Sequence, residues 1–265
     1  MPVRTRAGLR AVKSRAAILM KIARDRPDLF VDFECGGITD CPRRFVAVRR
    51  RARKNDENAD TNVENRQGLE AEKVSQKDDD FEEILCETEF VHSKDLSDDL
   101  KKSLVDLTRT NMKAQYDAAG KHRSNWLWDD DKKLSEISHK NARHFIVYVS
   151  NTAGDSGSSN SETHARREVA GFAHIRFEVE LGRETVYLYE FQVDPKYMGC
   201  GIGKYLLRLV EQSAFVMKCQ DVTLTCFKNN DAFLFYKKFG FKLDPDSPDE
   251  KSCPYEILTK PVKQK

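Results

Sequence analysis

One passage of this chain, from Val186 to Leu207, constrains the fold more than any other, because its periodicity changes within it. Its first part alternates aromatic or apolar side chains with others, which indicates a β-strand with one strongly apolar face. Asp194 and Pro195 end that strand. After Lys204 the apolar residues recur at helical spacing, which indicates a helix long enough to lie across a sheet. The passage therefore predicts a strand, a loop and a helix in direct succession.

Three glycines, Gly199, Gly201 and Gly203, lie in the predicted loop. Glycine has no Cβ, so backbone N–H groups can approach an anion closely, and the helix N-terminus adds about half a positive charge. The loop suits a phosphate or pyrophosphate, although a tight turn without a ligand has the same spacing. A P-loop is excluded because no Gly-Lys pair precedes Ser or Thr. The strand also lies too late for a first Rossmann unit.

Two ordered motifs carry a family resemblance. The loop from Met198 to Gly203 resembles the pattern [QR]-x-x-G-x-[GA] of the GCN5-related N-acetyltransferases, with Met198 at the Gln or Arg position. A later segment is similar to N-x-x-A-x-x-[FL]-Y-x-x-x-G-F of the same family, with matches at Asn229, Ala232, Phe235, Tyr236, Gly240 and Phe241. The resemblance implies acetyl-coenzyme A (acetyl-CoA) as cosubstrate. It also implies an α/β fold with a central, twisted, mixed and mostly antiparallel sheet flanked by helices.

Other segments resemble one branch of this family, the NatD type of N-α-acetyltransferase. They lie between Leu96 and Lys260 and include N-M-K-A-Q-Y at 111–116, W-L-W at 126–128, R-F-E-V-E at 176–180 and P-Y-E-I-L at 254–258. This resemblance implies direct transfer of acetyl to the N-terminal amine of histones four and two-A, whose tails begin Ser-Gly-Arg-Gly. It further implies an enzyme that acts without an auxiliary subunit.

The resemblance also implies roles for individual residues. The coenzyme is expected at Phe191, Gln192, Val193, Gly199, Cys200, Gly201, Ile202, Gly203, Lys204 and Asn230. The catalytic residues are expected to be Glu190 as the base, directly or through a water, with Tyr189, Tyr187 and Tyr236. The peptide is expected at Tyr116, Trp126, Glu178, Val179, Glu180, Tyr189, Thr225 and Tyr255.

Strict alternation along the strand conflicts with that catalytic group, because it places Glu190 on the face opposite Tyr187 and Tyr189. A β-bulge or a splayed strand would reconcile the three positions. Without the resemblance, the residues alone leave other interpretations open. Glu190 could face solvent, the tyrosines could be stacked core residues, and the Tyr236 phenol, which could protonate the departing thiolate, could be an ordinary core residue.

Composition predicts one catalytic domain with an N-terminal arm. Residues 1–54 hold 15 Lys or Arg against 5 Asp or Glu, whereas the remainder holds 30 against 38. The arm is therefore basic and the body acidic, which suits a basic peptide but also fits an ordinary solvated surface. Residues 55–80 are polar and acidic, as in a disordered linker. We expect a largely disordered arm and linker at 1–90 and the N-acetyltransferase domain at 91–262.

The cysteines and the apolar runs limit the remaining possibilities. The seven cysteines show no zinc-type spacing, so we expect no metal and a reducing compartment. No apolar run is long enough to span a membrane, and we expect no membrane association. A mitochondrial presequence at 1–24 is an alternative to location in the nucleus and cytoplasm. The basic cluster at 49–54 predicts nuclear targeting, or contact with nucleic acid or the ribosome.

The remaining patterns predict the order of the elements. A helix is expected at 95–116 behind Ser97 as N-cap, an acidic helix start near 129–131, and a strand at 143–149. A Gly/Ser-rich insertion at 151–167 precedes two long strands at 169–179 and 185–193. A further strand at 221–227 leads to a helix that begins near Asn229.

The residues also allow two other functions. One is acetylation of internal lysines or of a small polyamine, which needs the same coenzyme loop. The other is a non-catalytic histone-binding or RNA-binding module that keeps the fold without binding the coenzyme.

Overall fold

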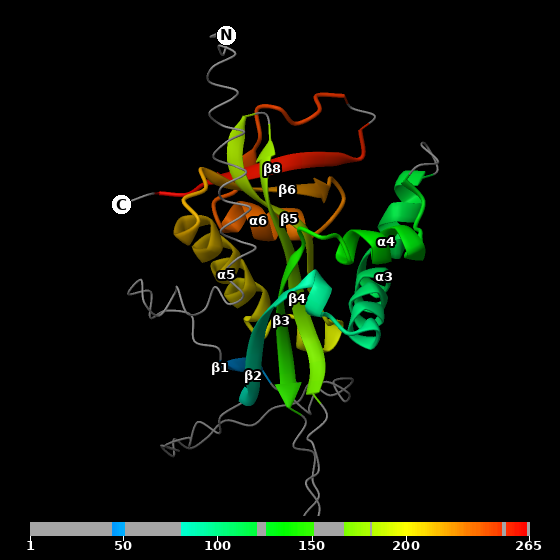
Figure 1. The fold of residues 1–265 in the computed structure, drawn as a ribbon, viewed down its shortest axis with the longest axis vertical. Helices are drawn as coiled ribbons and strands as arrows, with labels where there is room; N and C mark the ends of the chain where they lie inside the picture. The colour runs from blue at the N-terminus through cyan, green and yellow to red at the C-terminus, as the bar shows by residue number, and fades with distance from the viewer. Residues whose placement is uncertain are drawn as a thin grey trace, which may run out of the picture.

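A computed structural model describes residues 44–50, 81–120, 126–150, 167–180, 182–250 and 253–263. The predicted presequence, the linker at 55–80 and most of the insertion at 151–167 lie outside these ranges. The described residues form one eight-stranded sheet with the order β1-β2-β3-β4-β5-β6-β8-β7 (Figure 1). No helix in the described part of the chain has the length and apolarity needed to cross a bilayer.

The sheet is antiparallel except at one pair of strands. Its strands are β1 Arg44–Arg50, β2 Phe81–His92, β3 Arg143–Ser150, β4 Arg167–Glu180, β5 Arg183–Val193, β6 Asp221–Phe227, β7 Lys242–Leu243 and β8 Tyr255–Pro261. Only β5 and β6 run parallel, because the chain crosses between them through a helix. The prediction of a mixed, mostly antiparallel sheet is confirmed.

Helices cover both faces of the sheet. Helices α3 Asp98–Gly120 and α4 Asp130–Ile137 pack on one face, and α5 Ile202–Val216 and α6 Ala232–Lys238 on the other. Alternation along β3 separates the two cores, since Phe145 belongs to the α5 core and Ile146 to the α3 core. Short 3-10 turns at Ser93–Asp95 and Pro195–Tyr197 precede α3 and α5.

Side-chain caps fix where α3 and α4 begin. The backbone N–H of Leu100 donates to Ser97 Oγ at 3.2 Å, which confirms Ser97 as the N-cap of α3. Asp129 Oδ1 accepts from the N–H of Lys132 at 3.0 Å and caps α4 in the same way. A bidentate pair between Arg109 of α3 and Asp130 of α4, at 2.9 and 2.8 Å, then joins the two helices.

Two predicted boundaries are wrong. Helix α6 begins at Ala232 rather than near Asn229, because Asn230 Oδ1 accepts from the N–H of Ala232 at 2.8 Å and ends a preceding turn. The domain boundary at 91 is too late, since β2 begins at Phe81 and pairs with β3.

Strand β1 also belongs to the sheet, although it lies in the predicted arm. The N–H of Val48 donates to the carbonyl of Cys200 at 3.3 Å, and the ring of Phe45 stacks on Tyr205 at 3.8 Å. Arg49, part of the predicted basic cluster, donates to the carbonyl of Lys196 at 2.6 Å. The sequence missed this strand because a short run with three arginines is not typical of a core strand.

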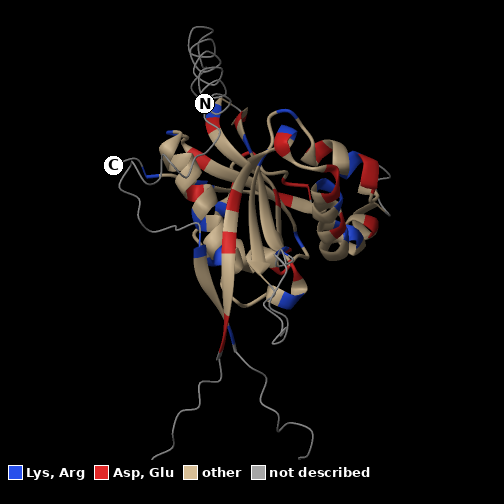
Figure 2. Cartoon of the chain, turned by 60° about the horizontal axis from the view of Figure 1, so that its bottom comes forward, with Lys and Arg blue, Asp and Glu red and all other residues tan. Residues whose placement is uncertain are grey.

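Charged residues of both signs cover the helices, whereas the central strands carry few (Figure 2). In this view the acidic residues are interspersed with basic ones.

Candidate functional site

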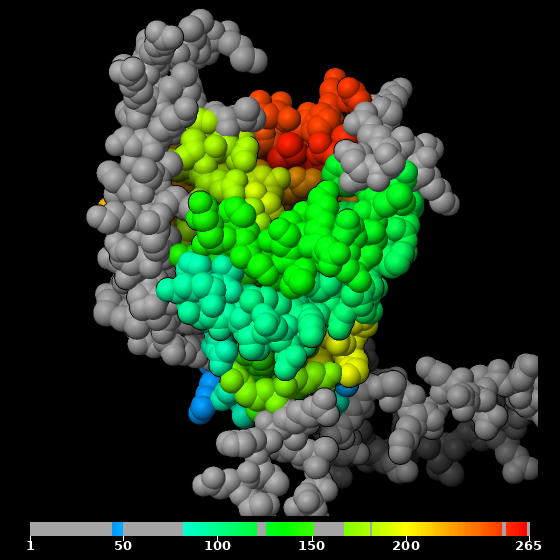
Figure 3. Space-filling model, turned by 45° about the vertical axis from the view of Figure 1, so that its right-hand side comes forward, coloured from blue at the N-terminus to red at the C-terminus, as the bar shows by residue number. Residues whose placement is uncertain are grey.

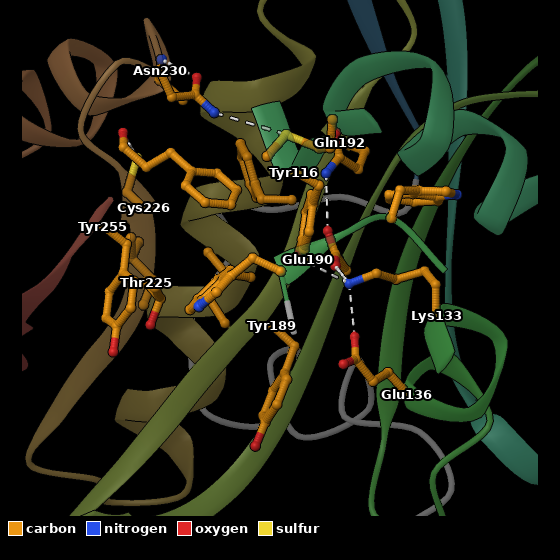
Figure 4. Close-up of a pocket in the computed structure, with 18 of the residues that line it drawn as sticks. Tyr116, Lys133, Glu136, Tyr189, Glu190, Gln192, Thr225, Cys226, Asn230 and Tyr255 are labelled. Atoms are coloured by element: carbon orange, nitrogen blue, oxygen red, sulfur yellow. Dashed lines mark hydrogen bonds and ion pairs between the residues drawn. The ribbon is translucent and has the colours of Figure 1, made fainter. Parts of the chain in front are cut away.

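A cavity lies where β5 and β6 separate. Their parallel pairing joins Thr185–Leu188 to Asp221–Leu224 and extends no further among the described residues. Beyond it β5 stays paired with β4 and β6 with β8, so the two strands diverge. The resulting cavity measures about 360 Å³, and residues from α3, α4 and α6 close its sides (Figure 4).

A β-bulge in β5 brings the predicted catalytic residues together. Ile175 of β4 faces Leu188, whereas the next residue, His174, faces Glu190, so Tyr189 is the extra residue. One extra residue reverses the alternation beyond it. Tyr187 before the bulge and Glu190 after it therefore lie on the same face of the sheet, toward α3 and α4. The predicted strand irregularity is present at the expected place.

Glu190 is a buried carboxylate, only 7% exposed, and each of its oxygens accepts one hydrogen bond. Its Oε1 accepts from Lys133 Nζ at 2.5 Å, and its Oε2 accepts from Gln192 Nε2 at 3.0 Å. Asn111 Nδ2 in turn donates to Gln192 Oε1 at 3.0 Å. The alternative of a strand carboxylate that faces solvent is therefore wrong.

Lys133 and Glu136 of α4 join this cluster, and the sequence analysis did not identify them. Lys133 Nζ also donates to Glu136 Oε2 at 2.7 Å and to the Tyr116 hydroxyl at 3.3 Å (Figure 4). A signal was available, because Lys133 stands four residues before the buried Ile137 and so shares the inward face of α4.

Tyr189 is clamped between β4 side chains. Its ring stacks on His174 at 5.1 Å, and the guanidinium of Arg176 lies 3.9 Å from the ring centre. Its hydroxyl donates to Glu178 Oε1 at 2.9 Å. Burial, and then the charge of Glu178, raise the pKa of Tyr189, so the phenol keeps its proton. Tyr189 thus orients a carboxylate beside the cavity.

Aromatic rings, beginning with Tyr116, form another part of the cavity wall. Tyr116 meets Phe227 at 5.1 Å, and Trp126 meets Tyr255 at 5.0 Å. Tyr187 and Thr225 share a hydrogen bond of 2.6 Å between β5 and β6. The space-filling view shows the α3–α4 segment, cyan to green, beside the C-terminal strands, orange to red (Figure 3).

The predicted peptide residues Glu178, Val179 and Glu180 do not line the cavity. They lie at the end of β4, where Glu178 reaches the cavity through the Tyr189 hydroxyl. Burial, followed by the charge of Glu178, raises the pKa of Glu180. The carboxylates of Glu178 and Glu180 therefore form an acidic pair next to the cavity rather than within it.

The glycine loop has the geometry of an anion cradle. Gly199 and Gly201 have φ of +78° and +91°, and a Cβ at either position would meet no atom within 4 Å. Gly201 is also the N-cap residue of α5, which has no side-chain cap. The backbone N–H groups at this helix start are therefore open to an anion. Met198 is 55% exposed, and Lys204 is exposed in the first turn.

Comparison with known proteins decides the family. The family model described as "Acetyltransferase (GNAT) family" matches residues 105–241, which is about half of the chain. The chain belongs to the GNAT acetyltransferase family. The match includes α4, the bulged strand β5, the glycine loop and α6.

Individual curated proteins match a shorter part of this GNAT protein than the family model does. Spermine/spermidine N(1)-acetyltransferase of Bacillus subtilis (strain 168) is 38% identical over 83 residues, 29% of this chain and 55% of that protein. A probable spermine N(1)-acetyltransferase of B. subtilis subsp. natto (strain BEST195) matches to the same extent. The chain thus spans about half the length of these curated relatives.

Solved structures are similar at lower identity. PaiA N-acetyltransferase from Thermoplasma acidophilum, in complex with coenzyme A, has a TM-score of 0.44 and 21% identity, covering 66% of this chain and 98% of that one. Ard1 from Thermoplasma volcanium has a TM-score of 0.44 and 15% identity, covering 67% and 99%.

Acetyl-CoA is the cosubstrate of this GNAT protein, and the cradle fits its pyrophosphate. The open N–H groups around Gly199 and Gly201 supply donors, while Lys204 adds a positive charge. Beyond the bulge, the edge of β5 that faces β6 is not paired with it, so backbone groups near Phe191 can bind an amide-bearing chain. The side chains of Cys200 and Ile202 are buried and hold the loop, so these residues could bind the coenzyme only through their backbone groups.

The other predicted coenzyme residues differ in the contacts that they make. Asn230 lines the cavity, with its Nδ2 3.8 Å from Met112 Sδ. The carbonyl of Val193 accepts from Asn111 at 3.0 Å, and the side chain of Gln192 is turned toward α3 by the same residue. The side chain of Gln192 therefore orients Glu190 rather than faces the coenzyme cradle.

Tyr236 and Cys226 also line the cavity. Burial raises the pKa of Tyr236 above its usual range, so this phenol is protonated at neutral pH. Burial raises the pKa of Cys226 to about 12, so its thiol is not a nucleophile at neutral pH. Sequence analysis missed Cys226. In the described part of the chain no group of His, Cys, Asp or Glu could hold a metal ion.

Proposed function

We propose that this GNAT enzyme is an N-α-acetyltransferase of the NatD type. It would transfer acetyl to the N-terminal amine of histones four and two-A, whose tails begin Ser-Gly-Arg-Gly. The observation that carries the proposal is that two carboxylates, those of Glu190 and Glu178, are held beside the bulge in β5. Glu190 lies at the floor of an aromatic-walled cavity, and the Tyr189 next to it holds Glu178 at its side.

The amine must lose a proton before or as it attacks. An α-amine has a reference pKa near 8 and a lysine amine one near 10.4, a difference of about 3 kcal/mol in the cost of deprotonation. A modest base therefore suffices for an α-amine. In the proposed mechanism Glu190 receives that proton, directly or through a water, because each of its oxygens keeps one lone pair beyond its present hydrogen bond.

Acetyl-CoA supplies the activated thioester and a thiolate that needs a proton when it leaves. Tyr236 is the proposed donor, since its phenol lines the cavity and burial keeps it protonated. Cys226 would take no covalent part, in agreement with direct transfer.

The acidic pair suits the arginine in the third position of the substrate. Glu178 is fixed by the Tyr189 hydroxyl at 2.9 Å, so it is pre-oriented for a guanidinium. Glu180 stands two residues along the same strand and therefore on the same face. The rings of Trp126 and Tyr255, 5.0 Å apart, both line the cavity into which the substrate N-terminus would extend.

A second candidate is acetylation of a polyamine or an internal lysine. It is favoured by the 38% identity to the spermine/spermidine acetyltransferase over 83 residues. An acidic pair beside the cavity would also suit a polycation. The two candidates differ in which amine reacts.

Mass spectrometry separates these candidates. The protein is incubated with acetyl-CoA and a Ser-Gly-Arg-Gly peptide, the same peptide with a blocked α-amine, a lysine peptide and spermine. We expect a single acetyl group on the free N-terminus only. Acetylation of the blocked peptide or of spermine at a higher kcat/KM would reject the α-amine assignment. Absence of any acetylated product would contradict both candidates.

Partners and location follow as further parts of the proposal. We propose that histone tails are the substrate partners, that the enzyme acts without an auxiliary subunit, and that it resides in the nucleus and cytoplasm. The basic arm would contact nucleic acid or the ribosome. Fractionation of cells that express the tagged full chain, with salt and nuclease washes, tests these expectations.

A further inference from the structure

A lysine is buried at the floor of the cavity. Lys133 is 5% exposed, yet its ammonium contacts oxygens from three elements: Glu190 of β5 at 2.5 Å, Glu136 of α4 at 2.7 Å and Tyr116 of α3 at 3.3 Å. The ammonium also lies 5.1 Å from the ring centre of Tyr116. A buried charge is costly unless it is paired and hydrogen-bonded, so this arrangement calls for a role.

The charge of Lys133 is constant over the range in which the enzyme would work. Burial lowers the pKa of Lys133, but Glu190, Tyr116 and Glu136 together outweigh burial and raise this pKa above its ordinary value. Lys133 is therefore a fixed cation. It neither accepts the proton of the amine nor donates one to a leaving group.

One of the three partners of the Lys133 ammonium is Glu190, the predicted base. Burial alone favours the neutral form of a carboxyl group, and an adjacent ammonium favours the ionised form. The ammonium binds Glu190 Oε1, while Gln192, held by Asn111, binds Oε2. Both oxygens are thus fixed in position, and each keeps a lone pair for the amine.

The position of Lys133 depends on the packing of two helices. The pair between Arg109 and Asp130 joins α3 to the first turn of α4, one turn before Lys133. Ile137 then anchors the end of α4 in the core with no exposure. The ammonium is therefore held against Glu190 by the scaffold and not by its own flexible stem.

We propose that Lys133 is a positioning residue for acetyl transfer, which holds Glu190 oriented to receive the proton of the acceptor amine. This inference rests on the role of Glu190 in the proposed function. As the new N–C bond forms and the C–S bond breaks, the proton passes from the amine to Glu190, and Lys133 remains an ammonium throughout. Glu136, whose side chain is 34% exposed, completes the pairing on the solvent side.

The pH profile of the Lys133→Met variant tests this role. We expect kcat/KM at pH 7 to fall about 100-fold, and the acid limb of its pH profile to move to higher pH, because the positive charge beside the proposed base is lost. Lys133→Arg should restore most of the activity. The affinity for coenzyme A, measured by calorimetry, should stay within about twofold, because the cradle is distant in sequence and built from backbone groups. Lys102→Met, at an exposed position on α3, is the control.

A double variant separates positioning from folding. Lys133→Met alone leaves a buried carboxylate unpaired, which lowers stability. In Lys133→Met/Glu190→Gln that charge is absent, and the protein should regain much of the lost Tm. If Lys133 acts through Glu190, the double variant should match Glu190→Gln alone within about threefold.

Three results would overturn the inference. They are an unchanged pH profile in Lys133→Met, equal loss of coenzyme affinity and activity, or a double variant more than about tenfold below Glu190→Gln. If Lys133→Met does not fold, the double variant decides. The assay uses whichever amine the wild-type protein acetylates. Failure of the histone peptide would therefore reject the proposed substrate and leave the test of Lys133 intact.

Discussion

The glycine loop (the coenzyme side) and the cavity between β5 and β6 (the acceptor side) are built from different parts of the protein. The coenzyme side is one continuous segment, Met198 to Lys204, and its donors are backbone N–H groups held by glycines with positive φ. The acceptor side assembles side chains from α3, α4, β4, β5, β6 and β8. A backbone site tolerates a change of side chain, such as the exposed Met198, whereas the assembled site depends on each partner.

We expect a substitution on the acceptor side to have the largest effect on activity. Glu190→Gln removes the proposed base but keeps the side-chain shape and a hydrogen-bond acceptor for Lys133. We expect kcat to fall by about 10²–10⁴-fold, the range for loss of a general base. Steady-state kinetics measure the fall, and calorimetry should show that the affinity for coenzyme A is unchanged. A rate within threefold of wild type would remove Glu190 from the chemistry, although the fold would be unaffected.

The fold and the coenzyme loop could be predicted because their signals are local. Ser97, the period of β5 and the glycines each act within a few residues of themselves. The sequence could indicate that an irregularity in this strand was needed. It could not show the form of the bulge, because the register between β4 and β5 depends on both strands. The Lys133–Glu190 pair joins residues 57 positions apart, so no motif contains it. Strand β1 was missed because only the tertiary fold shows what it packs against.

Acid should lower the stability of the fold through a buried histidine of β3. Burial lowers the pKa of His144 to about 4, and its Nε2 hydrogen-bonds the carbonyl of Ile137. Because the folded pKa lies below the reference value of 6.5, the unfolded chain binds more protons between these values. Stability is therefore lost as pH falls through this window, and the difference corresponds to about 3 kcal/mol. The buried His174 acts in the same direction.

Urea unfolding at pH 6.5 and at pH 4 checks this expectation. The free energy of unfolding should fall with acid in the wild type and fall less in His144→Leu. His139→Leu, at a half-buried position, should keep most of the wild-type dependence. Equal slopes in all three proteins would show that acid acts through carboxylates elsewhere.

A smaller effect is expected on the coenzyme side. Gly201→Ala forces a side chain into the left-handed region at φ +91°, which costs about 1–2 kcal/mol. If the loop shifts to relieve this strain, the affinity for coenzyme A should fall about tenfold, while the KM of the peptide is unchanged. Gly240→Ala is a matched control, since its φ is +89° and it lies outside the cradle. Equal losses of coenzyme affinity in both variants would mean that stability, and not the cradle, sets the affinity.

The smallest effect concerns the rim of the acceptor side. Glu178→Gln keeps an acceptor for the Tyr189 hydroxyl but removes the negative charge proposed to bind the substrate arginine. Because the group is partly exposed, we expect KM for a Ser-Gly-Arg-Gly peptide to rise only about three- to tenfold. A peptide with Gln in place of the arginine should show no difference between the two enzymes. A similar loss for both peptides would mean that Glu178 acts through Tyr189 and the cavity shape. The acceptor side would then lack a recognition element for arginine, and acetylation of a polyamine would become the favoured function.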